Sequence, residues 1–280
     1  NSGGDIQLTG DFDLTNGTFD AVERTVSLNG SSQQDIISNS PLTFHDLEID
    51  NSSSASPAVQ IASGSSSIEQ DLILSNGEFA TNGNLTLLST LSGGVISDAG
   101  ITESGGTVTG NALAQRVVDG SSENSPSGTN DGDASAGTLG SDAGWHTLGV
   151  PFDGGLTGAN LLDADDSQQI PVDLPAGGGS GSNTDNSMIF KYDSSSDSYQ
   201  SPDDLGKTAS TIELGQGEGF ILFFFDDNLD SINDDGFTIE ATGALPSFGS
   251  DVSFTGADAV DVNGSFAFFA NPYPSPYDLD

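Results

Sequence analysis

The densest group of side chains that could do chemistry is an acidic loop that follows a run of phenylalanines. It reads Asp226-Asp227-Asn228-Leu229-Asp230-Ser231-Ile232-Asn233-Asp234-Asp235-Gly236. Calcium takes about six to eight oxygen ligands, often from Asp and Asn at alternate positions with a glycine at the turn. We therefore predict a calcium site, with the ligands Asp226, Asp227, Asp230, Asn233 and Asp234. The EF-hand spacing is not met, so a solvated acidic hairpin loop is the alternative. Asn130-Asp131-Gly132-Asp133 is a weaker candidate of the same kind.

Few side chains of the sequence are candidates for a catalytic role. The only histidines are His45 and His146, and no Gly-x-Ser-x-Gly elbow surrounds a serine. Lyases that act on acidic sugars need a base and a cation, which Arg24 and Arg116 supply poorly in so acidic a chain. A glycoside hydrolase needs only two carboxylates, but none of the many pairs stands out. We predict that the chain is not an enzyme, with a glycan-active enzyme or carbohydrate-binding module as the alternative.

The aromatic residues allow a similar pair of interpretations. Phe220, Phe223, Phe225 and Trp145 could line a glycan platform. Such large apolar side chains more often lie in a core, and we predict a core position for them.

The charge balance is extreme. The chain has 42 Asp and Glu against 4 Lys and Arg, a formal net charge of −38. Such a chain repels itself at low ionic strength, whereas at 1 M salt the Debye length falls to about 3 Å and screens the repulsion. We therefore predict a protein adapted to high salt, with calcium loading in seawater as a further possibility. Nucleic-acid binding is excluded, because four scattered cations cannot form a basic patch.

Cysteine and long apolar runs are both missing from the sequence. With no cysteine, the fold has no disulfide and no thiolate site. The sequence has no run of about 18 apolar residues, so it predicts no membrane span. The chain begins at Asn1 without a signal-peptide pattern, which indicates a mature or trimmed product.

Residues 1–118 contain short strand-like clusters between turn formers. Residues 11–19 match residues 71–79 at an offset of 60, and each copy carries an Asn-Gly pair between two predicted strands. This pattern favours a β-solenoid-like repeat domain, with an ordinary β-sandwich as the alternative.

The rest of the chain has a different pattern. Residues 119–143 are an acidic stretch rich in Ser, Gly and Asn, which we interpret as a linker or surface loop. Residues 144–280 hold strand-like runs between polar loops, including the phenylalanine-rich run 220–225, which must be a central buried strand. They predict a β-sandwich domain, which we expect to be incomplete at residue 280.

Several motifs, in order, resemble a known family. Residues 107–117 end in Gly110-Asn111-Ala112-Leu113-Ala114-Gln115-Arg116-Val117, and an acidic stretch then leads to Gly144-Trp145-His146-Thr147-Leu148-Gly149-Val150-Pro151. Gly217-Glu218-Gly219-Phe220 and Asn271-Pro272-Tyr273-Pro274-Ser275-Pro276-Tyr277-Asp278 follow, and Phe44-His45-Asp46-Leu47-Glu48-Ile49-Asp50-Asn51 lies in the repeats. Together they resemble large adhesin-like cell-surface proteins that the type IX secretion system exports, here from a halophilic or marine bacterium. The carboxy-terminal sorting domain of that family is not in these residues.

The resemblance implies an exported protein that is surface-anchored or released, and it assigns no catalytic role. We therefore expect an all-β protein, an N-terminal β-solenoid-like repeat domain followed by a β-sandwich. Its expected function is that of an extracellular adhesin, envelope or filament subunit. Self-association, other surface proteins or glycans are the expected partners, because uncovered repeat ends favour stacking or strand addition.

Overall fold

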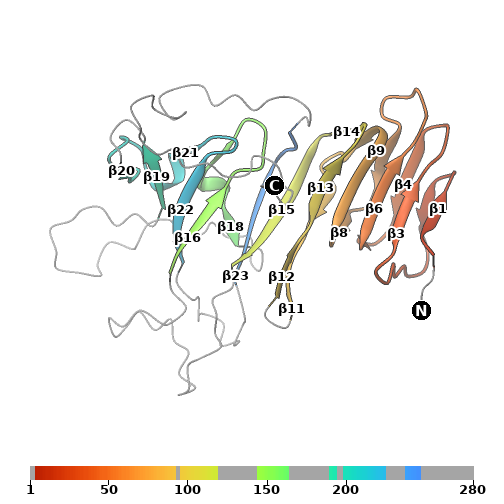
Figure 1. Ribbon diagram of the computed structural model, residues 1–280, viewed down its shortest axis with the longest axis horizontal. Coiled ribbons are helices and arrows are strands. Elements are labelled where there is room, and N and C mark those ends of the chain that lie inside the picture. Colours follow the sequence, from red (N-terminus) through yellow and green to blue (C-terminus); the bar gives the residue numbers. More distant parts are fainter. Residues whose placement is uncertain are drawn as a thin grey trace, which may run out of the picture.

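Short runs of aliphatic residues between polar turn formers become strands throughout the described chain. The structure, a computed structural model, describes residues 4–92, 95–118, 144–163, 189–193, 198–224 and 237–246. It is all-β, with 57% strand and 3% helix, and it contains a β-solenoid of about four turns (Figure 1). The predicted solenoid is therefore confirmed.

The solenoid has three faces, each built from parallel strands of successive turns. Face A consists of β1 (Ile6–Leu8), β3 (Thr25–Leu28), β6 (Asp46–Asp50), the first part of β9 (Asp71–Ala80) and β13 (Gly100–Glu103). Face B consists of β2 (Phe12–Leu14), β4 (Gln34–Ser38), β7 (Val59–Ser63), the second part of β9 and β14 (Gly106–Thr109). Face C consists of β5 (Leu42–Phe44), β8 (Ser66–Ile68), β10 (Leu85–Leu87) and β15 (Asn111–Val118).

Two rows of inward side chains run along face A, because alternate residues of a strand point to opposite sides. One row is Ile6, Val26, Leu47, Leu72 and Ile101, so successive turns are 20, 21, 25 and 29 residues long. The other row is Leu8, Leu28, Ile49, Leu74 and Glu103. The middle members of both rows are fully buried, and each contributes about 1.5–3 kcal/mol by leaving water. The longest turn contains the hairpin of β11 (Ser89–Ser92) and β12 (Val95–Asp98).

The two segments that match at an offset of 60 residues lie on different faces of the solenoid. Asp11 lies on face B beside Asp35, whereas Asp71 lies on face A beside Asp46. The Asn-Gly pair of the second copy forms no hairpin, because β9 runs through it and pairs on face A before it and on face B after it. Gly77 makes this corner with a φ of 85°, and a Cβ there would lie 2.7 Å from a backbone oxygen of the turn below.

A buried pair of amides stabilises the corner between faces A and B. Gln34 and Asn51 are both fully buried. The Gln34 Oε1 accepts hydrogen bonds from Gly30 N and from Asn51 Nδ2, each at 2.8 Å. The Gln34 Nε2 donates to the carbonyl oxygens of Leu8, at 3.0 Å, and Gly10. The network joins three turns and gives both the oxygen and the nitrogen of the Gln34 side-chain amide a partner, as a buried polar group requires.

The C-terminal part forms a four-stranded antiparallel sheet in the order β16 (Gly144–Gly149), β22 (Gly219–Phe224), β19 (Ile189–Asp193) and β20 (Ser198–Gln200). The phenylalanine-rich run is central in this sheet, as predicted, since β22 pairs on both sides. A small pair of β17 (Leu156–Thr157) and β21 (Glu213–Leu214) lies beside the 3₁₀ turns η3 (Gly158–Asn160) and η4 (Ala209–Thr211).

Two strands from the C-terminal part extend the solenoid. β23 (Phe237–Ala244) pairs antiparallel with β15 over eight residues, and β18 (Leu162–Asp163) pairs with β23. Gly243 lets the Phe152 ring approach, because a Cβ there would lie 2.5 Å from the ring. Phe152 belongs to the same continuous core as Ala112 of β15.

The C-terminal part therefore covers face C at the end of the stack. The described residues do not show the predicted β-sandwich, and the boundaries at 118 and 144 stay predictions.

Candidate functional site on the acidic faces of the solenoid

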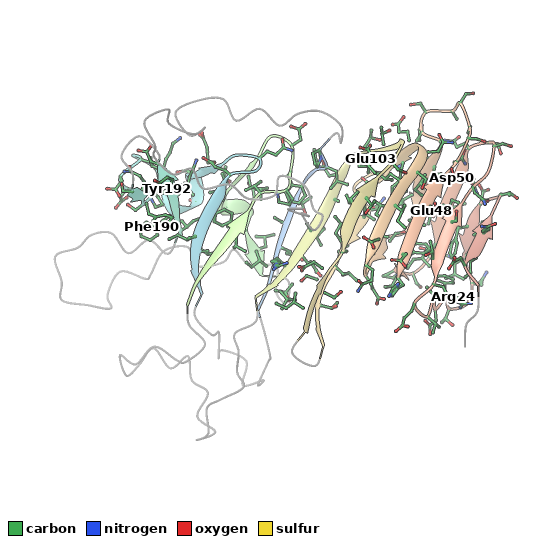
Figure 2. The ribbon with its side chains drawn as sticks, in the orientation of Figure 1. Arg24, Glu48, Asp50, Glu103, Phe190 and Tyr192 are labelled. Carbon is green, nitrogen blue, oxygen red and sulfur yellow. The ribbon has the colours of Figure 1, made fainter. Side chains whose placement is uncertain are left out.

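The predicted calcium ligands Asp226, Asp227, Asp230, Asn233 and Asp234 lie outside the described residues, as does the segment 130–133. In the part of the chain that the structure describes, no group of three His, Cys, Asp or Glu side chains is placed to hold a metal ion. Several acidic side chains lie on the outer faces of the solenoid, among them Glu48 and Asp50 of β6 (Figure 2).

On face A, carboxylates of adjacent turns lie next to each other. Asp46 begins β6, Asp71 begins β9, and the strand register places one directly beyond the other. The backbone N of Asp71 donates to Asp46 Oδ1 at 3.1 Å, and Thr25 Oγ1 of the preceding turn lies 3.5 Å from Asp46 Oδ2. The His45 Nδ1 lies 3.1 Å from the same oxygen. The Asp46 carboxylate thus contacts three successive turns.

Burial and the neighbouring charge both act on Asp71. Partial desolvation raises the pKa of the Asp71 carboxyl, and the Asp46 carboxylate raises it further. His45 acts in the opposite direction and lowers the pKa of Asp71. The pair is therefore a place where negative charge costs stability in the folded state.

Other carboxylates bridge turns in the same way. On face B, Asp11 Oδ1 accepts from the backbone N of Asp35 at 2.9 Å, and Asp35 Oδ1 accepts from Gln60 Nε2 at 2.9 Å. On face A, Glu48 Oε1 accepts from Ser75 Oγ at 2.9 Å. Each bond ties a carboxylate to the following turn, and the charge-assisted acceptor strengthens it.

The two lysines are used inside the C-terminal part. Lys191 Nζ lies 2.7 Å from Glu218 Oε1 and donates to the carbonyl oxygen of Glu213 at 2.8 Å. Lys207 Nζ lies 2.9 Å from Glu213 Oε1, and this hydrogen bond and charge lower the pKa of Glu213. Glu218 also accepts from the backbone N of Gly215, so it closes the turn that leads into β22. The Gly217-Glu218-Gly219-Phe220 motif thus makes structural contacts.

The two arginines are used within the solenoid. Arg24 Nε donates to the carbonyl oxygen of Ala21 at 2.8 Å, and its Nη2 lies 3.5 Å from that of Asp20. Arg116 of β15 pairs with Asp98 of β12. With the lysines engaged as well, the four cations of the sequence make contacts within the chain, and the carboxylates that remain outnumber them on its surface.

The structure describes the side chains of only some of the other residues that the sequence singled out. Phe220 is a core residue, as predicted, with 2% of its surface exposed. His45 lies beside Asp46 on the outside of the solenoid, with a quarter of its side chain exposed. Phe225 lies outside the described residues, and the side chains of Trp145, His146 and Phe223 are not described.

The stacking of Asp46 on Asp71 was missed by sequence reasoning, although a signal for it exists. Asp46-Leu47-Glu48-Ile49 and Asp71-Leu72-Ile73-Leu74 share an aspartate followed by alternating aliphatic residues. Aligning them would have given the turn length of 25 residues and placed the carboxylates in register.

The arrangement holds anionic oxygens in rows along a rigid surface, and such rows attract water and mobile cations. None of the helical segments in the described part has the length and hydrophobicity of a transmembrane helix. Comparisons with protein-family models, curated proteins and solved structures give no match for this chain.

Proposed function

We propose that the chain is a non-catalytic structural module of an extracellular surface, an adhesin, envelope or filament subunit that works in concentrated salt. The observation that carries this proposal is the pairing of carboxylates across turns, above all Asp46 with Asp71. A solenoid built in this way supplies a stiff, hydrated and strongly anionic shape.

The salt adaptation follows from the spacing of the charges. Adjacent strands lie about 4.8 Å apart, so carboxylates in register on successive turns repel each other. At about 10 mM salt the Debye length is near 30 Å and each carboxylate feels many others, whereas at 1 M it is about 3 Å. Molar salt therefore removes most of the repulsion, while the hydrogen bonds that these carboxylates accept from the next turn remain.

The surface location and the export route rest on the motif resemblance. The family implies a surface-anchored or released protein, and we propose the same type IX export for this chain. The Lys191–Glu218 contact and the turn at Gly215 support a structural reading of one of those motifs. We also propose that residues 144–280 form a β-sandwich, of which the four-stranded sheet is one layer. Self-association, other surface proteins or glycans remain the proposed partners, and calcium the proposed ion for Asp226–Asp234.

The salt dependence of folding tests the proposal. The β-sheet circular dichroism signal and the urea midpoint would be measured from about 2 M to about 10 mM NaCl, with EGTA throughout to remove calcium. We expect the folded signal to be lost or the midpoint to fall steeply at low salt. Choline chloride at equal ionic strength is the matched control, since screening predicts equal rescue by both salts. A full β signal and an unchanged midpoint at about 10 mM salt would refute the adaptation.

A further inference from the structure

The four-stranded sheet of the C-terminal part has two different faces, because alternate residues of a strand point to opposite sides. On one face lie Ile189, Phe220 and Leu222, which are almost fully buried and belong to the continuous core. Lys191 points to the same side, where its Nζ lies 2.7 Å from Glu218 Oε1. The other face is therefore the outer face of this sheet.

Aromatic side chains gather on that outer face. Phe190 and Tyr192 of β19 point to it, because they alternate with Ile189 and Lys191. The register pairs Tyr192 with Tyr199 of β20, and the two rings meet edge to face with their centroids 5.5 Å apart. Figure 2 shows Phe190 and Tyr192 close together, at the opposite end of the view from β1. We call Phe190, Tyr192 and Tyr199 the aromatic strip.

The aromatic strip is partly open to solvent. Tyr199 exposes 47% of its surface and is one of three large apolar side chains that are exposed among the described residues. Phe190 and Tyr192 are partly buried, as is Ile221 of β22, which the register places beside Phe190. Large aromatic side chains usually lie in a core, as Phe220 does, so a row of them on an outer face indicates a surface that binds a ligand.

The chemistry of the strip fits an uncharged sugar. One face of a pyranose ring carries C–H groups that pack against an aromatic ring, and the tyrosine hydroxyls can exchange hydrogen bonds with sugar hydroxyls. The formal net charge of −38 disfavours an anionic ligand at moderate salt, and molar salt weakens the attraction of a cationic one. Stacking of uncharged surfaces keeps its strength in both conditions, because it does not depend on charge.

The small extent of the strip argues against a protein partner. A stable protein interface takes about 20–30 residues from each side. Among the described side chains of the outer face, the strip offers three aromatic rings with Ile221 beside them. A short chain of sugar rings matches an area of this size, whereas a folded partner would need a far larger one.

We propose that Phe190, Tyr192 and Tyr199 form a binding platform for uncharged glycan chains. This inference rests on the proposed function as a surface protein. It selects glycans among the proposed partners and places them on the C-terminal part, away from the acidic faces of the solenoid. The platform uses different aromatic residues from Phe220, which sequence reasoning considered for this role and which is a core residue.

Titration calorimetry with the full chain in molar NaCl tests the proposal. The probes are the uncharged cellohexaose, laminarihexaose and mannohexaose, with hexagalacturonate as the anionic comparison. We expect at least one uncharged probe to bind, and hexagalacturonate to bind more weakly. Tyr199→Ala should weaken that binding by at least about tenfold, whereas Tyr199→Phe keeps the ring and should retain most of it. Leu205→Ala is the matched control, because it removes another exposed apolar side chain of the C-terminal part and should bind as the wild type does.

Three outcomes would overturn the proposal. The first is that none of the uncharged probes binds the folded wild type, or that hexagalacturonate alone does. The second is a Tyr199→Ala protein that keeps the wild-type circular dichroism and the wild-type affinity. The third is an equal loss of affinity in Leu205→Ala, which would assign binding to general surface hydrophobicity. The proposed salt adaptation fails on a different result, full folding of the wild type at low salt.

Discussion

Replacing Asp71 with asparagine should make the protein more stable at low salt. Asp71 lies one turn beyond Asp46 on face A, and burial and the Asp46 carboxylate together raise the pKa of Asp71. Asparagine has nearly the same shape and removes the charge. The hydrogen bond from Asp71 N to Asp46 Oδ1 uses the backbone and therefore survives the substitution.

The size of the effect follows from the strand spacing. Two unit charges about 4.8 Å apart repel by about 0.9 kcal/mol in water, since the pair is partly exposed. Exposed side chains can also move apart, so we expect a gain of about 0.5–1 kcal/mol in the free energy of unfolding at low salt. At 1 M salt the Debye length of about 3 Å reduces the direct repulsion to about 0.2 kcal/mol.

The pH dependence has a definite sign. Because the pKa of Asp71 is raised in the folded state, ionisation of this carboxyl costs stability at every pH above its folded pKa. The cost disappears once the pH is below about 3.9, the ordinary value of an aspartate, where the carboxyl is protonated in both states. The advantage of Asp71→Asn should therefore be complete near pH 7 and be lost as the pH falls through the folded pKa.

Urea unfolding followed by circular dichroism measures these differences, near pH 7 and near pH 3.5, in low and in molar salt. Asp50→Asn is the control, because it removes one exposed carboxylate from the same face. It should give a smaller gain at low salt. The reasoning is refuted if Asp71→Asn gains equally in low and molar salt, or if it gains no more than Asp50→Asn.

Two further substitutions test the packing that holds the acidic faces in place. Gln34→Leu should lower the free energy of unfolding by about 2–4 kcal/mol, because it leaves several buried backbone and amide groups without a partner; urea unfolding in molar salt measures this, and a loss below about 0.5 kcal/mol would contradict it. Gly243→Ala should cost about 1–3 kcal/mol, because the new Cβ would lie 2.5 Å from the Phe152 ring. Gly10→Ala is its control, since nothing lies within 4 Å of that Cβ, and an equal loss in both variants would refute the contact.

The solenoid could be predicted from the sequence, whereas the lengths of most of its turns could not. Alternation of aliphatic and polar residues reports which side chains point inward, and this holds for all three faces. Turn length depends on which strands stack, and the turns vary because corners and the hairpin of β11 and β12 have different lengths. The match of residues 11–19 with 71–79 reflected a shared strand-and-corner chemistry on two different faces.

The closing strand of the solenoid was beyond sequence reasoning for a related reason. Residues 237–240 belong to the segment 144–280, for which the sequence predicts a β-sandwich, so a partner strand within that sandwich was expected. These residues instead pair with β15, more than a hundred residues earlier in the chain. A strand's own residues specify its half-buried surface, whereas its partner is selected by long-range packing.

The acidic faces, too, could be predicted only in part. The composition predicts a surface that needs salt, whereas the pairing of particular carboxylates depends on which strands stack in register. A solenoid makes this register important, because its stability is approximately a sum of turns and of the interfaces between them. At low salt, repulsion should therefore destabilise most the turns whose carboxylates are in register, as at Asp46 and Asp71. It should destabilise β15 least, because Arg116 there pairs with Asp98. We therefore expect the turns of β6 and β9 to depend most on salt for their stability, although they lie in the middle of the stack and their aliphatic rows are fully buried.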